Sequence, residues 1–209
     1  MKKIALWLRA TLVSAVIVSV FTFGAQAGPL VQNGGFETSD FSGWTQIGDT
    51  GYTGVRSSAD TCPGGVSGTL GWCAPHSGTY AAFFGPTSSL GGISQLLPTA
   101  AGATYDLDFW LVVNIGVGGP PNEFKVSWNG VAITDVVNAP TAPWTHYAWS
   151  GLTAPGSSTE LKFEFWNPPN WFGLDDVRVA GVPEPVSLAL TGLGLLAVFS
   201  LGRFARRRR

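Results

Sequence analysis

Residues 105–113 read Tyr105-Asp-Leu-Asp-Phe-Trp-Leu-Val-Val113, and this stretch decides the fold. Apolar or aromatic side chains occupy every second position from Tyr105, whereas Asp106 and Asp108 fall between them. Because side chains on a strand point alternately to its two faces, this pattern predicts a β-strand with one face in the core. The residues expected in the core are Tyr105, Leu107, Phe109, Leu111 and Val113.

Similar patterns recur on both sides of this stretch. In 161–166 the odd-numbered residues are Leu or Phe, and the even-numbered ones are Lys, Glu and Trp. An Asn129-Gly130 pair joins two short alternating runs, which favours a type I′ hairpin turn. Short runs separated by Gly, Pro, Asn and Ser, without a helical period, predict an all-β antiparallel β-sandwich over residues 28–181. Strands are expected near 29–32, 43–47, 80–84, 91–97, 103–113, 123–128, 131–137, 144–150, 159–166 and 173–180.

The charge of this central part is acidic. Residues 28–181 contain twelve acidic and four basic residues, a net charge of −8. A nucleic-acid-binding domain needs a basic face to replace phosphate counterions, so nucleic acid is excluded as a partner. Neutral sugars and divalent cations remain compatible with this charge.

The N-terminus has the layout of a secretory signal peptide. Two lysines follow Met1, an apolar run covers 12–23, and Ala25-Gln26-Ala27 supplies small residues for cleavage. We expect residues 1–27 to form a signal-peptide helix, to be exported by the Sec machinery and to be removed after Ala27. A retained membrane anchor is the alternative.

The C-terminal residues 182–209 combine three features in a fixed order. Pro183-Glu184-Pro185 precedes an apolar run over 186–202, which as a helix would be about 26 Å long, close to the hydrocarbon thickness of a bilayer. Basic residues then predict that the C-terminus stays in the cytoplasm. They are Arg203, Arg206, Arg207, Arg208 and Arg209.

This tail resembles the PEP-CTERM sorting signal of Gram-negative bacteria. The resemblance implies a transmembrane helix that an exosortase, a membrane-embedded cysteine transpeptidase, recognises and cleaves near Pro183-Glu184-Pro185. The chain would then be a precursor tethered to the inner membrane and later a protein of the cell surface or extracellular matrix. A permanent single-span anchor is the alternative, although it leaves the Pro-Glu-Pro motif unexplained.

Two motifs flank the central domain. It opens with Leu30-Val-Gln-Asn-Gly-Gly-Phe-Glu37 and Phe41-Ser-Gly-Trp44, and it closes with Phe172-Gly-Leu-Asp-Asp-Val-Arg-Val179. These ends resemble the galactose-binding-like jelly roll of many carbohydrate-binding modules. The resemblance implies that the two ends are paired in space.

Such modules often hold a structural calcium ion between these ends. Carried over, the resemblance implies that Glu37 and either Asp175 or Asp176 bind Ca²⁺, with backbone carbonyls near 33–35. Strand parity places Asp175 on the face of Val177 and Val179, which is unusual for a carboxylate without a partner. The alternative is that these acids cap turns or the strand edge in solvent.

Cys62 and Cys73 are the only cysteines in the chain. In an exported protein, an even pair predicts a disulfide bond. A thiol nucleophile is the alternative, but the sequence around these residues contains no catalytic motif for one.

The sequence does not predict an enzyme. It contains no Gly-x-Ser-x-Gly motif, and only His76 and His146 could serve as histidine bases. Asp106 and Asp108 share one strand face at a separation that a glycosidase could use, but a solvated polar face explains them more simply.

Aromatic residues suggest binding instead. Trp110 and Trp166 fall on the polar sides of their strands, and Trp72 and Trp171 lie in expected loops, where a flat ring can stack on a sugar. The sequence therefore favours a non-catalytic carbohydrate-binding module, with extracellular polysaccharide as its partner. A structural surface or biofilm-matrix protein without a small ligand is the alternative.

Overall fold

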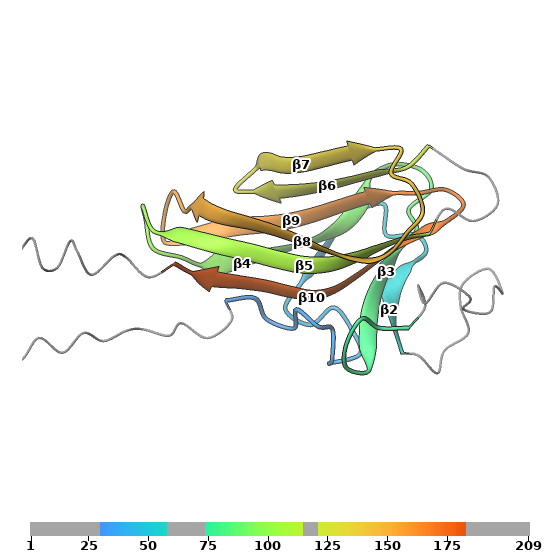
Figure 1. Ribbon diagram of the computed structural model, residues 1–209, viewed down its shortest axis with the longest axis horizontal. Coiled ribbons are helices and arrows are strands. Elements are labelled where there is room, and N and C mark those ends of the chain that lie inside the picture. Colours follow the sequence, from blue (N-terminus) through green and yellow to red (C-terminus); the bar gives the residue numbers. More distant parts are fainter. Residues whose placement is uncertain (1–29, 58–73, 115–120, 183–209) are drawn as a thin grey trace, which may run out of the picture.

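The computed structural model describes residues 30–57, 74–114 and 121–182. Within these ranges the chain forms ten β-strands and no helix (Figure 1). No helix in the described part is therefore long and apolar enough to cross a membrane. The strands are β1 (Thr45–Gly48), β2 (Thr53–Ser57), β3 (Tyr80–Phe84), β4 (Gly91–Pro98), β5 (Thr104–Asn114), β6 (Glu123–Trp128), β7 (Val131–Val137), β8 (Ala142–Thr153), β9 (Ser158–Trp166) and β10 (Trp171–Gly181).

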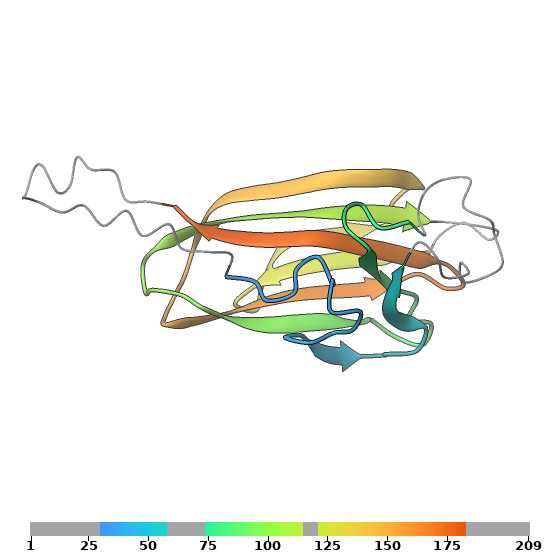
Figure 2. The ribbon, with the colours of Figure 1, turned by 90° about the horizontal axis from the view of Figure 1, so that it is seen from below.

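The strands form two five-stranded sheets in which every pairing is antiparallel. Sheet A has the order β1-β4-β9-β6-β7, and sheet B has the order β2-β3-β10-β5-β8. Most strands run along the long axis of the molecule (Figure 2). The predicted all-β antiparallel sandwich is confirmed.

The core lies between the two sheets and follows the alternation of the sequence. All five apolar positions predicted for β5 are buried, and so are the three Leu and Phe residues of β9. Their even-numbered neighbours in β9 point outward and are half-buried. The largest fully buried side chains include Phe36, Phe84, Phe109, Phe124, Phe163, Phe165 and Phe172.

In the N-terminal half, one predicted strand is wrong and one observed strand was not predicted. Residues 30–32 form bends and turns instead of the strand expected near 29–32. Strand β2, which the sequence did not predict, pairs with β3. Strand β2 escaped prediction because all five of its residues are half-buried, so it carries no apolar alternation.

Besides the backbone hydrogen bonds that join Leu30 and Gly34 to β10, one buried side chain, Gln95 of β4, holds the N-terminal segment. Its Oε1 accepts a hydrogen bond from the backbone N–H of Gln32 at 2.8 Å. Its Nε2 donates to the carbonyl oxygens of Gln32 at 3.0 Å and Gly43 at 2.8 Å. The Gln95 amide thereby satisfies both backbone groups of Gln32, which a strand at 30–32 would have paired with a neighbouring strand.

We predict that Gln95→Ala lowers the free energy of unfolding by about 1–3 kcal/mol, because it leaves part-buried backbone groups without partners. Chemical denaturation of the purified protein measures this change. The control is Gln46→Ala on neighbouring β1, whose exposed side chain predicts a change within about 0.5 kcal/mol. Equal stability of the two variants would contradict the assignment.

Candidate functional site

Two of the tryptophans predicted to stack on sugar, Trp110 and Trp166, lie on opposite sides of the sandwich. Trp166 ends β9 and points outward from sheet A, whereas Trp110 lies in β5 and points outward from sheet B. Trp171 begins β10 and is half-buried, with its indole beside Gly85. A single ligand on the outer face of one sheet therefore cannot stack on both Trp110 and Trp166.

The outer face of sheet A carries an ordered set of charges, which we call the charged face. Lys125 of β6 forms ion pairs with Glu123 at 3.5 Å and with Asp135 of β7 at 3.2 Å. On β9, Lys162 forms an ion pair with Glu164 at 3.0 Å. Lys125 and Glu164 are direct cross-strand partners, so the two groups of charges are adjacent.

These charged side chains are more enclosed than ordinary surface residues. The side chains of Glu123, Lys125 and Lys162 are only 25–26% exposed, and that of Glu164 is 19% exposed. The two cross-strand partners of Lys162, Ser94 and Ser127, are buried on either side of it. The hydrogen bond that Lys125 donates to Asp135, together with the charges of Asp135 and Glu123, raises the pKa of Lys125, so this lysine keeps its charge.

Trp166 lies at one end of the charged face, directly across from Glu123. Its Nε1 donates to the carbonyl oxygen of Thr87 at 3.2 Å, which ties the indole to the loop between β3 and β4. Asp49 in turn fixes this loop, because its Oδ2 accepts the backbone N–H groups of Thr87 and Ser88. These bonds and one from Gly51 lower the pKa of Asp49 to about 2.

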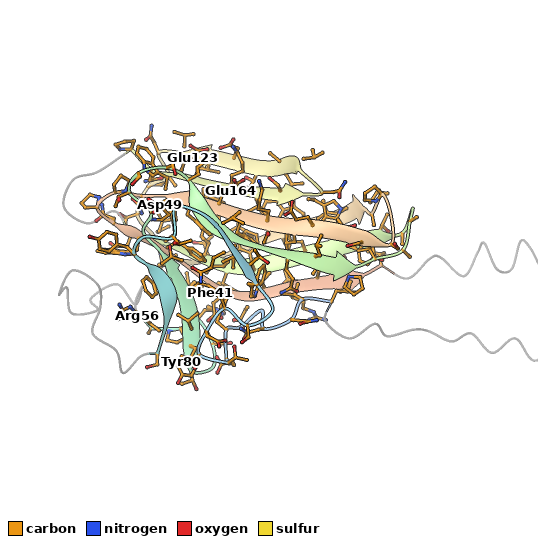
Figure 3. The ribbon with its side chains drawn as sticks, turned by 180° about the vertical axis from the view of Figure 1, so that it is seen from behind. Phe41, Asp49, Arg56, Tyr80, Glu123 and Glu164 are labelled. Atoms are coloured by element: carbon orange, nitrogen blue, oxygen red, sulfur yellow. The ribbon has the colours of Figure 1, made fainter. Side chains whose placement is uncertain are left out.

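Figure 3 shows Asp49, Glu123 and Glu164 near the same end of the molecule. The charged face therefore presents the indole of Trp166, which is fixed by its N–H hydrogen bond, and carboxylates that are fixed by ion pairs with Lys125 and Lys162. Carboxylates accept hydrogen bonds from hydroxyl groups, ammonium groups donate to them, and an indole can cover an apolar ligand face. A neutral polyhydroxylated ligand has the chemistry that this set of groups can bind.

Trp110 on the opposite side is already covered by protein. The ring of His76 stacks on it with 3.7 Å between centroids and 15° between planes. His146 lies tilted against it at 5.1 Å. A sugar could therefore reach that face of Trp110 only by displacing His76.

The two histidines are themselves held by carboxylates. His76 Nδ1 lies 2.6 Å from Asp176 Oδ2, and His146 Nε2 lies 3.5 Å from Asp108 Oδ1. Asp106, the other acid weighed for glycosidase chemistry, accepts the backbone N–H of Gly151 at 3.1 Å. Asp106 and Asp108 thus contact β8 in this structure.

Sequence reasoning missed Trp144, which belongs to the same cluster. Its Nε1 donates to the carbonyl oxygen of Ala74 at 3.0 Å, and its ring lies across Gly173 of β10. No local sequence pattern signals this contact, because Ala74 and Trp144 are 70 residues apart.

The three carboxylates predicted to bind calcium do gather in space. Oδ1 of Asp175 and Oδ1 of Asp176 each lie 3.8 Å from the point that a Cβ on Gly35 would occupy, and Glu37 Cγ lies at the same distance. The opening and closing motifs of the domain are also bonded directly, because Val177 N donates to Gly34 O at 2.9 Å. The expected pairing of the two ends is confirmed.

These carboxylates already accept hydrogen bonds from the loop that precedes β3. Asp175 Oδ2 accepts the backbone N–H groups of His76 and Ser77, and Asp176 Oδ1 accepts the Ser77 hydroxyl. Glu37 accepts the N–H groups of Thr79 and Tyr80.

The predicted backbone ligands are also engaged. Asn33 O accepts from Phe36 N and from Trp44 Nε1, and Gly34 O accepts from Val177 N. Within the described ranges, no group of three or more His, Cys, Asp or Glu side chains is arranged to hold a metal ion. The donor set does not form a calcium shell in this arrangement, and calcium binding stays a prediction.

The predicted orientation of Asp175 is wrong. It pairs with Trp110 and points outward from sheet B, whereas Val177 and Val179 are in the core. A register shift between Asp175 and Arg178 causes the change, with Asp176 at a φ of 51°. Such a bulge inserts an extra residue and reverses the parity of the rest of the strand.

Several predicted residues lie outside the described ranges. They are the signal peptide 1–27, Cys62, Trp72, Cys73, the sorting motif Pro183, Glu184 and Pro185, the apolar run 186–202, and Arg203, Arg206, Arg207, Arg208 and Arg209. The disulfide bond and the sorting tail stay predictions.

Comparison with known proteins finds similarity in structure. No protein-family model and no curated protein sequence matches the chain. TmCBM61, solved in complex with beta-1,4-galactotriose, is similar over 73% of this chain and 98% of its own, with 21% identity and a TM-score of 0.54. The enzymatically active domain of bacteriophage CBA120 tailspike protein 4 is similar over 74% of this chain, with 15% identity and a TM-score of 0.50. This chain spans 21% of that phage protein. These likenesses show the fold, which is the sandwich of a carbohydrate-binding-module jelly roll.

We predict that Asp175 makes the protein less stable as the pH rises. Burial and the nearby charge of Asp176 raise the pKa of Asp175 to about 7, against the lowering effect of its backbone hydrogen bonds. The folded state therefore holds a proton that the unfolded chain has released between about pH 4 and 7. The free energy of unfolding should fall by about 1.4 kcal/mol per pH unit from pH 5 to 7, since this stabilisation is complete only below the unfolded pKa.

Denaturation of wild-type protein and Asp175→Asn across this pH range, with a chelator present, measures the effect. The amide imitates the protonated acid, so this part of the slope should disappear in Asp175→Asn. Asp106→Asn, on β5 of the same sheet, should keep the wild-type slope. Identical slopes for wild type and Asp175→Asn would refute the assignment.

Proposed function

We propose that this chain is an exported, non-catalytic protein that binds a neutral polysaccharide through the charged face of sheet A. The observation that carries the proposal is the placement of Trp166 beside Glu123, next to the row formed by Glu164, Lys125 and Asp135. Ion pairs between side chains only 19–43% exposed hold this row in position.

Ordered polar groups suit a ligand made of hydroxyl groups. A carboxylate or ammonium group already held in place loses little side-chain entropy when it binds, and a hydrogen bond to a charged group is stronger than one between neutral groups. Trp166 adds an apolar contact for the C–H face of a sugar ring. The excess of acidic residues in the domain favours neutral over anionic polysaccharides.

The fold supports the same class of ligand. TmCBM61, which has the same sandwich, was solved with beta-1,4-galactotriose. We therefore take β-linked neutral polysaccharides, with galactan first, as the ligands to test.

We predict that Trp166→Ala weakens binding to the preferred polysaccharide by about tenfold, the effect of losing about 1.4 kcal/mol. Glu164→Gln should also weaken binding, because it removes a charged acceptor and leaves Lys162 without its ion-pair partner. Affinity electrophoresis in gels containing galactan, xylan or β-glucan identifies the ligand, and calorimetry then gives the affinities.

Trp110→Ala is the matched control. It removes a half-buried tryptophan from the other sheet, and His76 already stacks on that residue. Binding should persist in this variant once its melting curve shows that it is folded. Loss of binding in Trp110→Ala with normal binding in Trp166→Ala would refute the charged face as the site. A protein that binds no polysaccharide would favour the structural matrix alternative.

The C-terminal tail extends the proposal to sorting. Residues 182–209 combine the Pro-Glu-Pro motif, an apolar run and a basic end, which we interpret as the signal for an exosortase. The folded domain continues up to this signal, since Val182 N donates to Thr104 O at 2.9 Å. Cleavage near the motif would release the whole domain from the inner membrane toward the cell surface.

We predict that replacing Pro183, Glu184 and Pro185 by alanine makes the uncleaved precursor accumulate in the inner membrane. Fractionation and immunoblotting of cells that contain the matching exosortase measure this accumulation. Val182→Ala, one residue before the motif, should be processed normally. Normal release of the triple-alanine protein would exclude the sorting proposal.

A further inference from the structure

One end of the sandwich, which we call the tail end, contains the point where the chain continues into the C-terminal tail. It comprises the β4–β5 loop 99–103, the β6–β7 turn 129–130, the β8–β9 loop 154–157 and Val182. Figure 1 shows that strand β10 ends on this side of the sandwich.

Hydrogen bonds join the loops of the tail end into one surface. Thr99 N donates to Ser157 O at 3.1 Å, and Gly102 N donates to Ala154 O at 2.8 Å. Ala154 N donates back to Ala103 O at 2.9 Å. The hydrogen bond from Val182 N to Thr104 O ties the last described residue to the same surface.

The tail end has no charged group in these loops. Residues 99–103, 129–130 and 154–157 contain no Asp, Glu, Lys, Arg or His. Three large apolar side chains next to these loops are exposed: Leu96 at 70%, Val131 at 68% and Val182 at 39%. These loops are therefore neutral and made of small residues, and exposed apolar side chains lie beside them. One charged residue borders the loops: Glu160 of β9 is half-buried and is the cross-strand partner of Leu96.

The length of the connection limits how far this end can lie from a membrane. Only residues 183–185 separate Val182 from the apolar run 186–202. Residues 182 and 186 are four residue steps apart and can therefore be at most about 14 Å from each other. The polar interface of a bilayer is itself about 5–7 Å deep on each side. If the apolar run spans the membrane, Val182 therefore lies within about 10 Å of the outer edge of the lipid headgroups.

We infer that the tail end is a membrane-docking surface, which rests on the bilayer that holds the precursor before it is cleaved. This inference rests on the proposed function of the tail. The absence of charged groups from the loops fits a surface pressed against lipid, since a charge removed from water without a partner is unfavourable. Leu96 and Val131 would then contact the headgroup and upper acyl region.

Docking in this way sets the distance between the charged face and the bilayer. Strand β9 runs from Ser158 at the tail end to Trp166, about 26 Å along the strand. Trp166 and the loop fixed by Asp49 would point away from the bilayer, toward polysaccharide outside.

Photo-crosslinking of the full-length precursor in vesicles of phosphatidylethanolamine and phosphatidylglycerol tests this inference. The variants Val131→p-benzoylphenylalanine and Val137→p-benzoylphenylalanine form a matched pair, because both valines are exposed and lie at opposite ends of β7. Leu96 and Tyr52, 70% and 68% exposed, form a second pair. After irradiation, mass spectrometry should find several-fold more lipid adduct at positions 131 and 96 than at positions 137 and 52.

Two controls distinguish failure of the proposed tail from failure of the docking surface. Extraction with alkaline carbonate first shows whether the tail anchors the protein, and a protein released by carbonate would refute the proposed tail. An anchored protein with equal adducts at both positions of each pair, or with none at 131 and 96, would overturn the docking surface alone. Melting curves of each variant confirm that the labelled proteins are folded.

Discussion

The pairing of the last strand with the first motif is the constraint on which this structure depends. Strand β10 lies at the centre of sheet B, between β3 and β5. The opening motif bonds to it twice, through Leu30 N to Val179 O and Val177 N to Gly34 O. Gly34 must be glycine, because a Cβ there would overlap the carbonyl of Val177. The domain is thus completed only by its final residues, which brings the first described residue, Leu30, beside the end of β10.

The bulge in β10 has a second consequence. By turning Asp175 outward and placing Asp176 at a positive φ, it presents two adjacent carboxylates to the loop before β3. That loop then donates two backbone N–H groups to Asp175 and the Ser77 hydroxyl to Asp176, and it lays His76 on Trp110. The same irregularity therefore anchors a long connection and covers a tryptophan that would otherwise be open to ligand. On sheet A, by contrast, the ion pairs of Glu164 and Lys125 join them to residues of the same sheet, and we therefore take the charged face as the better site.

Much of this fold is predictable from local patterns in the sequence, and the rest is not. Alternation predicted the strands that bury one complete face, such as β5 and β9, because burial of Phe109 or Phe163 requires a period of two. It failed for β2, which buries neither face, and for Asp175, because a bulge reverses parity without changing the residue pattern. The alternation identified Trp110 and Trp166 as outward-facing residues, but it could not predict that His76 stacks on Trp110. That contact depends on a loop 34 residues earlier in the chain, whose position only the packed sheets determine.

Membrane docking and polysaccharide binding are proposed for opposite ends of the same strands. Every strand of the charged face runs between the tail end and the opposite end, so position along β9 sets distance from Val182. Glu160 and Leu96, which are cross-strand partners, lie near the tail end, whereas Trp166 and Glu123 lie near the other. A polysaccharide site at the tail end would face the lipid of the membrane. If a long flexible linker joined Val182 to the apolar run, the tail end could stay away from the membrane and would not need to be neutral. The short connection therefore accounts for both features at once: the neutral loops beside Val182 and the placement of Trp166 at the far end of the sheet.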